Sequence, residues 1–438
     1  MGLPRPLGPY SVGFADFELL RTEGVHGGIA TASILQHNSP DFVMLADAQG
    51  APLIRIFYPT SHANCGSTPL SSACRWMPSI MYTWGYISKL IRPSSTMHRL
   101  AIWVLTGVVH SCMWPGVLIQ ASVATPILTS GDNGDEGRLP VIIFSHGLWA
   151  CRTTYSALCC DLASHGYMKS LTTFLGFQVV VVPEHLDGSA NMASYADHNG
   201  KRKWLQNTFA DVPVNQITMH DRAKQLRQRV LEVRKVIDVL ESIDRGLLTQ
   251  NANTVNGKSA LDVNMLQTRL DLHFIAVSGH SFGGATSIVA SGIDKRIKCC
   301  LAMDVWWEPI DKMEFEKLAG KVPVLLLNTE NFDWKALRDA RSIFMKARRD
   351  ATQDGRPLVT ILKTIKGTSH QDQSDFTMLF PKIMKKLGVA GKLDPFLTKN
   401  INSRACLDFL HKHLLPPGMG SPYAVDAVED AEHIIVEY

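Results

Sequence analysis

The sequence predicts an α/β fold in which a mostly parallel central sheet carries helices on both faces. Three observations support this prediction. Apolar, β-branched runs such as 140–146 and 178–183 are nearly continuous, as in strands that are buried on both faces. These runs alternate along the chain with segments of helical periodicity. A glycine-rich turn at 279–284 follows one of the runs and leads into a helix-forming segment.

The first half of the chain supplies three predicted strands. The run 51–59 alternates in polarity and ends in proline, which favours a place near a sheet edge. The run 140–146 has the composition of a buried strand, and a helix at about 153–165 follows it and ends at Gly166. The β-branched run 178–183 is the next predicted strand.

The second half begins with a long amphipathic helix at 221–244, whose apolar residues recur at spacings of three and four. These apolar residues are Leu226, Val230, Val233, Ile237, Leu240 and Ile243. Four more strands are predicted at 272–278, 298–303, 322–328 and 358–365.

We predict one domain over residues 51–418. An N-terminal extension at 1–50 is expected to pack only partly on the core. The tail at 419–438 holds five acidic residues and no Lys or Arg, and we expect it to fray. Within the domain, the apolar segment at about 79–124 is predicted to form interfacial helices, and residues 168–177 form an insertion just before a central strand.

Composition excludes several classes of function. The 438 residues are 45% hydrophobic and 19% charged, with a net charge of +4, so no nucleic-acid partner is expected. The nine cysteines show no CxxC spacing, and we expect neither a metal site nor a cofactor. The first twenty residues lack the apolar core of a secretory signal. This favours a cytoplasmic location, with peripheral membrane contact as a further possibility.

Residues 279–284 read Gly-His-Ser-Phe-Gly-Gly and have the G-x-S-x-G spacing of a nucleophile elbow. In such an elbow a strained turn lifts the serine hydroxyl above the sheet, and small residues let strand and helix approach closely. Ser281 is therefore the candidate nucleophile, and the N–H of Phe282 is a candidate donor to an oxyanion. The alternative is a structural glycine-rich turn.

A serine nucleophile needs a base and an orienting carboxylate, which follow it as acid and then histidine in the α/β-hydrolase order. Asp304 ends the strand 298–303 and is the preferred acid, with Glu330 and Asp333 as rivals. His370 lies in a loop straight after the strand 358–365 and is the preferred base. The weaker candidate acids are Asp294, Glu308 and Asp311.

A second oxyanion donor is expected from the loop after the strand 140–146. That loop reads Ser145-His-Gly-Leu148, and Gly147 permits the tight turn that would present the N–H of Leu148. An ordinary strand-ending glycine turn is the alternative.

The segment 79–124 is open to three interpretations. Ile80, Trp84, Ile87 and Ile91 recur at helical spacing, and residues 100–124 contain no Asp, Glu, Lys or Arg. A bilayer span, core helices and a lipid-docking surface all fit this pattern. A span would have to leave and re-enter one domain between two strands of its sheet, so we favour a docking surface. Its predicted contacts are Trp84, Ile87, Ile91 and Trp103.

The motifs together resemble the platelet-activating factor acetylhydrolases of the plasma and intracellular type II kinds. The similar segments extend through most of residues 7–415. They are Gly279–Thr286, Phe144–Leu148, Arg152–Ala157, Asp161–Gly166, Val182–His185, Asp187–Ala190, Gly8–Gly13, Leu301–Asp304 and Gly367–Gln371.

This resemblance implies an α/β-hydrolase fold and a calcium-independent hydrolase that removes the sn-2 acetyl or short, oxidised acyl chain of phospholipids. It implies Ser281 as nucleophile, Asp304 as orienting acid and His370 as base, with the N–H groups of Leu148 and Phe282 as oxyanion hole. It also implies action at a membrane or lipid-particle surface. The oligomeric state stays open.

The chain departs from the family pattern at several places near the predicted site. The insertion 168–177 precedes the strand 178–183, and whether that strand stays intact is open. Leu186 stands where the family has an arginine that could brace nearby carboxylates. Trp149 replaces a glycine after the oxyanion loop and would narrow the pocket.

The leading hypothesis is therefore a phospholipid sn-2 esterase. Two alternatives remain. One is a general short-chain carboxylesterase that uses no membrane. The other is a catalytically inactive hydrolase fold that binds lipid or a partner protein.

Overall fold

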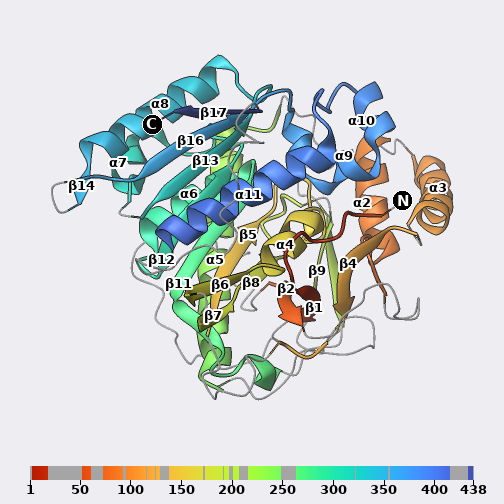
Figure 1. Cartoon of the computed structure of the whole chain (residues 1–438). Helices are drawn as coiled ribbons and strands as arrows, with labels where there is room; N and C mark the ends of the chain where they lie inside the picture. The colour runs from red at the N-terminus through yellow and green to blue at the C-terminus, as the bar shows by residue number, and fades with distance from the viewer. Residues whose placement is uncertain are drawn as a thin grey trace, which may run out of the picture.

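An eleven-stranded sheet forms the centre of the molecule (Figure 1). The structure is a computed structural model of the chain. It describes residues 2–17, 52–60, 73–91, 95–114, 116–123, 125–128, 138–170, 173–190, 192–196, 201–206, 216–247, 263–320, 322–353, 356–414 and 433–437.

The strands of this sheet lie in the order β17-β16-β13-β12-β11-β5-β8-β2-β1-β4-β3. The stretch from β16 to β8 is parallel, as the buried apolar runs predict. Its strands are β5 (Leu139–Ser145), β8 (Val179–Pro183), β11 (Leu270–His280), β12 (Ile297–Met303), β13 (Val324–Thr329) and β16 (Thr360–Ile365). The others are β1 (Ser11–Phe17), β2 (Ile54–Thr60), β3 (Ala73–Arg75), β4 (Leu118–Val123) and β17 (Ile434–Glu437).

Alternate residues of the parallel strands enter two separate cores, one on each face of the sheet. In β8, for example, Val180 and Val182 pack on one side, whereas Val179 and Val181 pack on the other. The first core is covered by α4 (Ser156–Ala163) and α11 (Pro395–His413), with α2 (Ile80–Leu90) and α9 (Asp375–Leu379) at its end.

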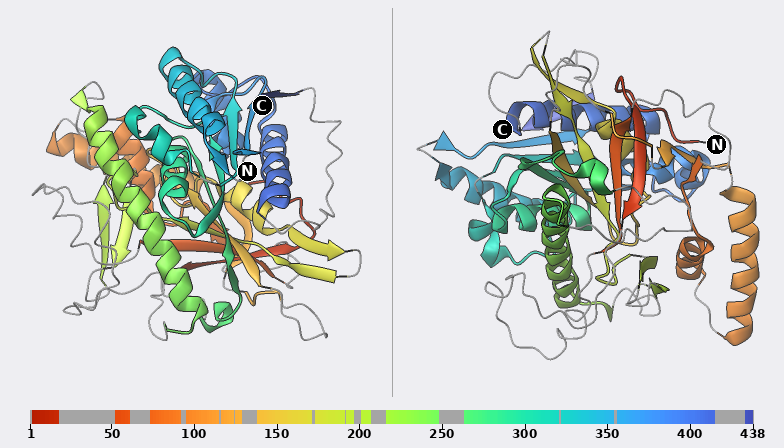
Figure 2. Two further views of the ribbon diagram at one scale, coloured as in Figure 1. Left: turned by 90° about the vertical axis from the view of Figure 1, so that its left-hand side faces the viewer. Right: turned by 90° about the horizontal axis from the view of Figure 1, so that it is seen from below.

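The second core is covered by α5, α6, α7 and α8 (Figure 2). These helices span Met219–Asp244, Phe282–Ile293, Phe315–Leu318 and Lys335–Asp350. The long helix α5 begins at a capping box in which Thr218 and Asp221 bond each other's backbone N–H. Helices on both faces of a mainly parallel sheet agree with the predicted fold class.

Both chain ends contribute to the sheet, which corrects part of the predicted organisation. From the extension 1–50, β1 pairs antiparallel with β2 along its whole length, whereas residues 18–50 lie outside the described residues. The fraying expected of the tail 419–438 does not hold for β17, which pairs antiparallel with β16. Residues 419–432 lie outside the described residues.

The strand β2 is interior and not near an edge, because β1 and β8 flank it. Its Pro59 is tolerated there because β8 pairs only with Ile54–Phe57, so the proline lies beyond that ladder. The strand is completely buried.

The insertion 168–177 forms most of a hairpin made of β6 (Gly166–Ser170) and β7 (Thr173–Phe177). This hairpin belongs to a separate two-stranded sheet. The strand β8 that follows it pairs with β5 and β2, so the central sheet continues past the insertion without a break. Two more small sheets join β9 (Met192–Ala196) to β10 (Arg202–Gln206) and β14 (Thr352–Gln353) to β15 (Arg356–Pro357).

The apolar segment 79–124 holds two helices, α2 and α3 (Thr96–Met113), and then the strand β4, so its last part is not helical. Trp84 and Ile87 are buried, at 8% and 9% exposed, because they face the core beneath α2; their prediction as lipid-facing residues is wrong. Ile91 and Trp103 are 40% and 37% exposed, and their contact with lipid stays a prediction. Among the described residues, neither α3 nor any other helix has the length and apolar character to cross a membrane.

Candidate active site

The turn that carries Ser281 has the geometry of a nucleophile elbow. The strand β11 ends at His280, α6 begins at Phe282, and Ser281 between them has φ 59° and ψ −115°. A Cβ atom on Gly283 would lie 1.9 Å from the carbonyl oxygen of Ser145, and one on Gly279 would lie 2.3 Å from that of Gly283. Only glycine allows this approach of strand and helix, as the spacing predicts.

The structure brings Ser281, Asp304 and His370 together at the carboxyl ends of the parallel strands. Asp304 follows β12, and His370 lies in the loop after β16, at the start of the 3-10 helix η6 (His370–Gln373). The ring Nε2 of His370 is 3.0 Å from the Ser281 hydroxyl oxygen, and Nδ1 is 3.0 Å from Oδ2 of Asp304. The parallel strands thus deliver three residues that are far apart in sequence to one edge of the sheet.

Asp304 is fully buried, and its remaining acceptor sites are satisfied by one residue of the neighbouring strand β13. The backbone N–H of Thr329 donates to Oδ1 at 2.6 Å, and its hydroxyl donates to Oδ2 at 2.7 Å. Donors on both oxygens fix the plane of the carboxylate. The carboxylate can therefore orient the imidazole of His370 and stabilise its protonated form.

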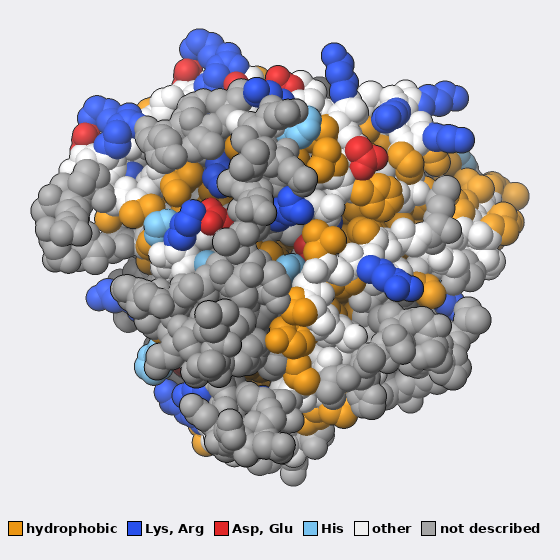
Figure 3. Space-filling model, viewed as in Figure 1, with side chains coloured by type: hydrophobic (Ala, Val, Ile, Leu, Met, Phe, Trp, Pro, Cys, Tyr) orange, Lys and Arg blue, Asp and Glu red, His pale blue; other side chains and the backbone are white. Residues whose placement is uncertain are grey.

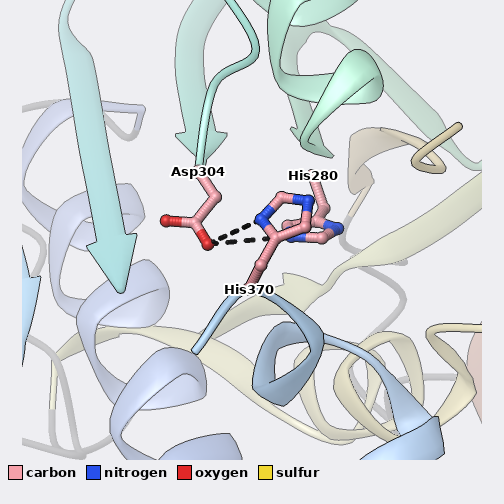
Figure 4. A group of neighbouring side chains, drawn as sticks. All are labelled: His280, Asp304 and His370. Atoms are coloured by element: carbon pink, nitrogen blue, oxygen red, sulfur yellow. Dashed lines mark hydrogen bonds and ion pairs between the residues drawn. The ribbon is translucent and has the colours of Figure 1, made fainter. Parts of the chain in front are cut away.

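Two rings hold the imidazole of His370 in place, and sequence reasoning missed the first of them, Phe332. Phe332 stacks on it with ring centroids 3.7 Å apart, and His280 lies 4.3 Å from it at a tilt of 37°. Figure 4 shows His280 and His370 both directed toward Asp304. Burial, and then the neighbouring His370, keep the pKa of His280 well below its usual range, so this ring stays neutral.

The rival acids are engaged elsewhere. Glu330 accepts the N–H of Gly367 at 2.7 Å, and Asp333 forms ion pairs with two arginines of α8. Asp294 is buried and paired with Arg296. Glu308 accepts the Trp306 ring N–H, and Asp311 caps a 3-10 helix.

One group in the described part of the chain has ligand atoms close enough to hold a metal ion, and it is His280, Asp304 and His370. Its atoms lie within 4.8 Å of one another. Asp304 already accepts two hydrogen bonds from Thr329, and His370 is hydrogen-bonded to both Asp304 and Ser281. This bonding suits an orienting acid and a base, and it matches the order expected for a Ser–His–Asp set.

The loop after β5 is held by hydrogen bonds on both sides of Leu148. The N–H of Gly147 donates to the Tyr155 hydroxyl at 3.2 Å, and the N–H of Trp149 donates to the carbonyl of Ser189 at 2.9 Å. Among the described residues, no group accepts a hydrogen bond from the N–H of Leu148 or of Phe282. Both donors are thus available to an oxyanion, and their role there remains a prediction.

Trp149 itself adopts φ 61°, a conformation that favours glycine, and this strain accompanies the departure from the family pattern. The ammonium of Lys89, on α2, lies 4.2 Å from the centre of its ring. The cation–π contact ties α2 to the loop.

Two arginines from elsewhere in the chain bind the carboxylates on either side of Leu186. Arg152 pairs with Glu184 at 2.6 Å and with Asp16 at 3.1 Å, and it also donates to the Tyr82 hydroxyl. Arg229 pairs with Asp187 at 3.0 Å. The carboxylates next to Leu186 are therefore braced without a local arginine.

A second serine–histidine–carboxylate series, buried in the protein, holds the start of the oxyanion loop at Ser145. The ring of His185 joins the Ser145 hydroxyl and Glu232 of α5, with 2.8 Å on each side. The three residues are completely enclosed, so this serine cannot meet a substrate. Burial and the charge of Arg229 lower the pKa of His185 well below its usual range, and burial raises the pKa of Glu232 to about 7.

Glu232 should make the stability of the protein depend on pH. In the folded state its carboxyl keeps a proton that the unfolded chain releases above its ordinary pKa of 4.5. The contribution of this protonated carboxyl to the stability of the folded state is complete below pH 4.5 and is lost as the pH rises through about 7. We therefore expect Glu232→Gln to gain stability relative to the parent, by up to about 3 kcal/mol, between these pH values.

Urea unfolding at a series of pH values checks this expectation. The matched control is Glu316→Gln on the exposed side of α7, for which the difference from the parent should stay constant. A difference for Glu232→Gln that does not change with pH would show that Glu232 ionises alike in both states.

Comparison with known proteins agrees with this site. Residues 1–416 match the family model described as "Platelet-activating factor acetylhydrolase, isoform II". A platelet-activating factor acetylhydrolase of Canis lupus familiaris is 29% identical over 367 residues, which cover 82% of this chain and 71% of that protein. The one of Cavia porcellus is 27% identical over 420 residues, which cover 94% of this chain and 78% of that protein.

Two further proteins are more distant. A "Putative phospholipase A2" of Schizosaccharomyces pombe is 25% identical over 325 residues, which cover 64% of this chain and 69% of that protein. The solved structure of a ferulic acid esterase from Streptomyces cinnamoneus superposes with a TM-score of 0.57 at 16% identity and covers 100% of this chain and 99% of its own. This structural likeness confirms the α/β-hydrolase fold class. By the match over residues 1–416, the chain belongs to the family of the platelet-activating factor acetylhydrolases, isoform II.

Proposed function

We propose that this protein is a calcium-independent serine esterase of the phospholipase A2 type. It hydrolyses the sn-2 acetyl, or short or oxidised acyl, ester of platelet-activating factor and related phospholipids. The observation that carries the proposal is the hydrogen-bonded series Ser281–His370–Asp304, with 3.0 Å on each side of the imidazole. Membership of the family supports the class of substrate.

The reaction proceeds in two steps. His370 Nε2 takes the hydroxyl proton of Ser281 as its oxygen attacks the ester carbonyl, and Asp304 stabilises the imidazolium. The N–H groups of Leu148 and Phe282 hold the oxyanion of the tetrahedral intermediate. The lysophospholipid alkoxide leaves with the proton from His370, and an acyl-enzyme remains. Water then attacks the acyl-enzyme with His370 as base, which releases the carboxylic acid and restores the Ser281 hydroxyl.

The exposed face of α3 suits a lipid surface. The helix α3 exposes Leu100, Val104 and Val108, at 58%, 63% and 55%, along one stripe with Trp103. Large contiguous exposed apolar patches mark interaction sites. Trp103 also stacks on Trp84 at 4.3 Å, which joins the stripe to α2.

Basic residues lie on α10 (Pro381–Lys386), which follows a contact with the carboxyl end of α3. This short helix exposes Lys382, Lys385 and Lys386 with the apolar Ile383 between them. The preceding Phe380 packs on Trp114 at the end of α3, with ring centroids 5.5 Å apart. Figure 3 shows blue side chains along the upper right edge beside orange ones. Apolar and basic groups together are the pattern of a helix that binds an anionic membrane surface.

Charging the stripe should weaken action on aggregated lipid. We expect Leu100→Glu/Val104→Glu to raise KM by about tenfold or more on anionic vesicles that carry the substrate, because each apolar side chain removed from the interface loses about 1–2 kcal/mol. Hydrolysis of a water-soluble acetyl ester should be unchanged. Met313→Glu, at an 85% exposed apolar site on another face, is the control. Equal KM values for the double variant and the control on vesicles would contradict docking by α3.

The proposed function is tested by a rate series over sn-2 chain length, from acetyl upward, with monomeric and aggregated phospholipid. We expect kcat/KM to fall as the chain lengthens, to exceed that for a soluble short-chain ester, and to persist in EDTA. An enzyme whose kcat/KM on the phospholipid does not exceed that on the soluble ester would be a general carboxylesterase. A folded protein without turnover on any ester would contradict the proposal.

A further inference from the structure

Arg229 is a buried cation at the centre of the site's supporting structure. It lies on α5, beneath the ends of β5 and β11, and is completely enclosed. Burial of a guanidinium is costly unless its donors are satisfied and its charge is paired. Its Nε meets this need with bonds of 3.0 Å to Asp187 Oδ2 and to the Ser189 hydroxyl. A buried cation that needs so many partners indicates that the position of the guanidinium is important for the residues it contacts.

The guanidinium holds the oxyanion loop from two directions. Its Nη1 donates to the backbone carbonyl of His146, two residues before Leu148, and lies 3.4 Å from the Ser145 hydroxyl. Its Nη2 donates to the Ser189 hydroxyl, and the carbonyl of Ser189 in turn accepts the N–H of Trp149, one residue after Leu148. The backbone is thus held before and after Leu148.

The same guanidinium also contacts the elbow. Its central carbon lies 4.8 Å from the centre of the Phe282 ring, which is fully buried. This is a cation–π contact in a dry environment, where such contacts are strongest. Phe282 carries the other predicted oxyanion donor on its backbone. One side chain therefore touches both halves of the predicted oxyanion hole.

We propose that Arg229 is a positioning residue that sets the separation of the two oxyanion donors. It does not touch the substrate. It acts through the His146 carbonyl and Ser189 on the loop and through the Phe282 ring on the elbow. The inference rests on the proposed function, because it assigns Arg229 a role in the same reaction. A displacement of about 1 Å in such a site can lower the rate by about 10²-fold.

A second buried arginine offers a matched control. Arg348 of α8 is as enclosed as Arg229 and donates to the Thr360 hydroxyl and to the backbone carbonyls of Val322 and Val359. It too lies near a phenylalanine ring, at 5.9 Å from Phe344. None of these partners belongs to the elbow, the oxyanion loop or the His370 loop. Arg348→Lys therefore makes the same chemical change at an equally buried position away from the site.

The experiment compares Arg229→Lys with Arg348→Lys. Both variants should unfold at lower urea concentration than the parent, because lysine cannot reproduce the fork of donors. Only Arg229→Lys should lower kcat, by about 10–100-fold with KM within about threefold, because the lost contacts act on the transition state. The inhibition constant of a trifluoromethyl ketone analogue, which forms a hemiketal oxyanion on the serine, should rise by the same factor. That of an ether analogue without a carbonyl should not change.

Equal kcat values for Arg229→Lys and Arg348→Lys would overturn the inference, and so would a change in KM alone. If Arg229→Lys does not fold, Ser189→Ala is the variant that tests the inference. It removes an acceptor shared by two guanidinium nitrogens, and we expect it to lower kcat about threefold or more. An unchanged kcat in Ser189→Ala would overturn the inference. The esterase activity of the parent enzyme separates the proposed function from the proposed role of Arg229. A parent without esterase activity contradicts the proposed function, whereas an active parent with an equally active Arg229→Lys contradicts only the role of Arg229.

Discussion

Ser281→Ala should lower kcat/KM on an sn-2 acetyl phospholipid by about 10⁴-fold or more and abolish labelling by a fluorophosphonate probe. Both reactions need the hydroxyl oxygen that lies 3.0 Å from His370 Nε2. No other residue of the elbow Gly279–Gly284 carries a hydroxyl group. The fold should be unaffected, since alanine fits the same turn with the strain that serine already bears at φ 59°.

Ser278→Ala is the matched control, three residues earlier on β11. Its hydroxyl is buried and, among the described residues, has no hydrogen-bond partner, so its loss should leave both rate and labelling unchanged. Labelling that persists in Ser281→Ala would show that another group is the nucleophile.

The central parts of the fold and site were predictable because they depend on local sequence. The elbow needs glycine at two positions where a Cβ atom would overlap a backbone oxygen, and that requirement is visible in the spacing alone. Asp304 and His370 follow strands whose apolar runs are easily recognised, and parallel strands end at one edge of the sheet. Their position in chain order therefore predicted their meeting in space.

The parts that were missed depend on contacts between distant segments. Phe332 stacks on His370 from the loop after β13, and nothing in its neighbourhood marks it as a site residue except its place beside the rival acids Glu330 and Asp333. Arg229 looks like one charge on an amphipathic helix, and only the packing of α5 beneath the elbow shows that it is enclosed. A fully buried arginine is rare enough that sequence favours the exposed alternative.

The error in α2 has a different cause. Helical periodicity identifies a face that is apolar but does not say what covers it, and an apolar face packed on a core has the same pattern as one laid on lipid. Trp84 and Ile87 belong to the first case, whereas the apolar residues Leu100, Val104 and Val108 of α3 are exposed. The distinction comes from their neighbours, because the Trp103 ring covers Trp84.

Asp304→Asn should lower kcat by about 10⁴-fold with little change in stability, and the reason lies in the hydrogen bonds of Thr329. Oδ1 must stay an oxygen, because it accepts the fixed backbone N–H of Thr329 at 2.6 Å. The new amide nitrogen must then take the place of Oδ2 and donate toward His370 Nδ1. That forces the proton of the imidazole onto Nε2, which faces Ser281, and a ring in this tautomer cannot accept the serine proton.

The control is Glu330→Gln, which makes the same change in the rival acid. Glu330 accepts the N–H of Gly367, a bond that the amide oxygen of glutamine can also accept, so kcat should fall by less than about tenfold. The two variants thus separate an orienting carboxylate from one that only holds the His370 loop. A larger loss in Glu330→Gln than in Asp304→Asn would reverse the assignment. Because Thr329 dictates which oxygen is replaced, an active Asp304→Asn enzyme would also mean that the imidazole is oriented by something other than the acid at the end of β12.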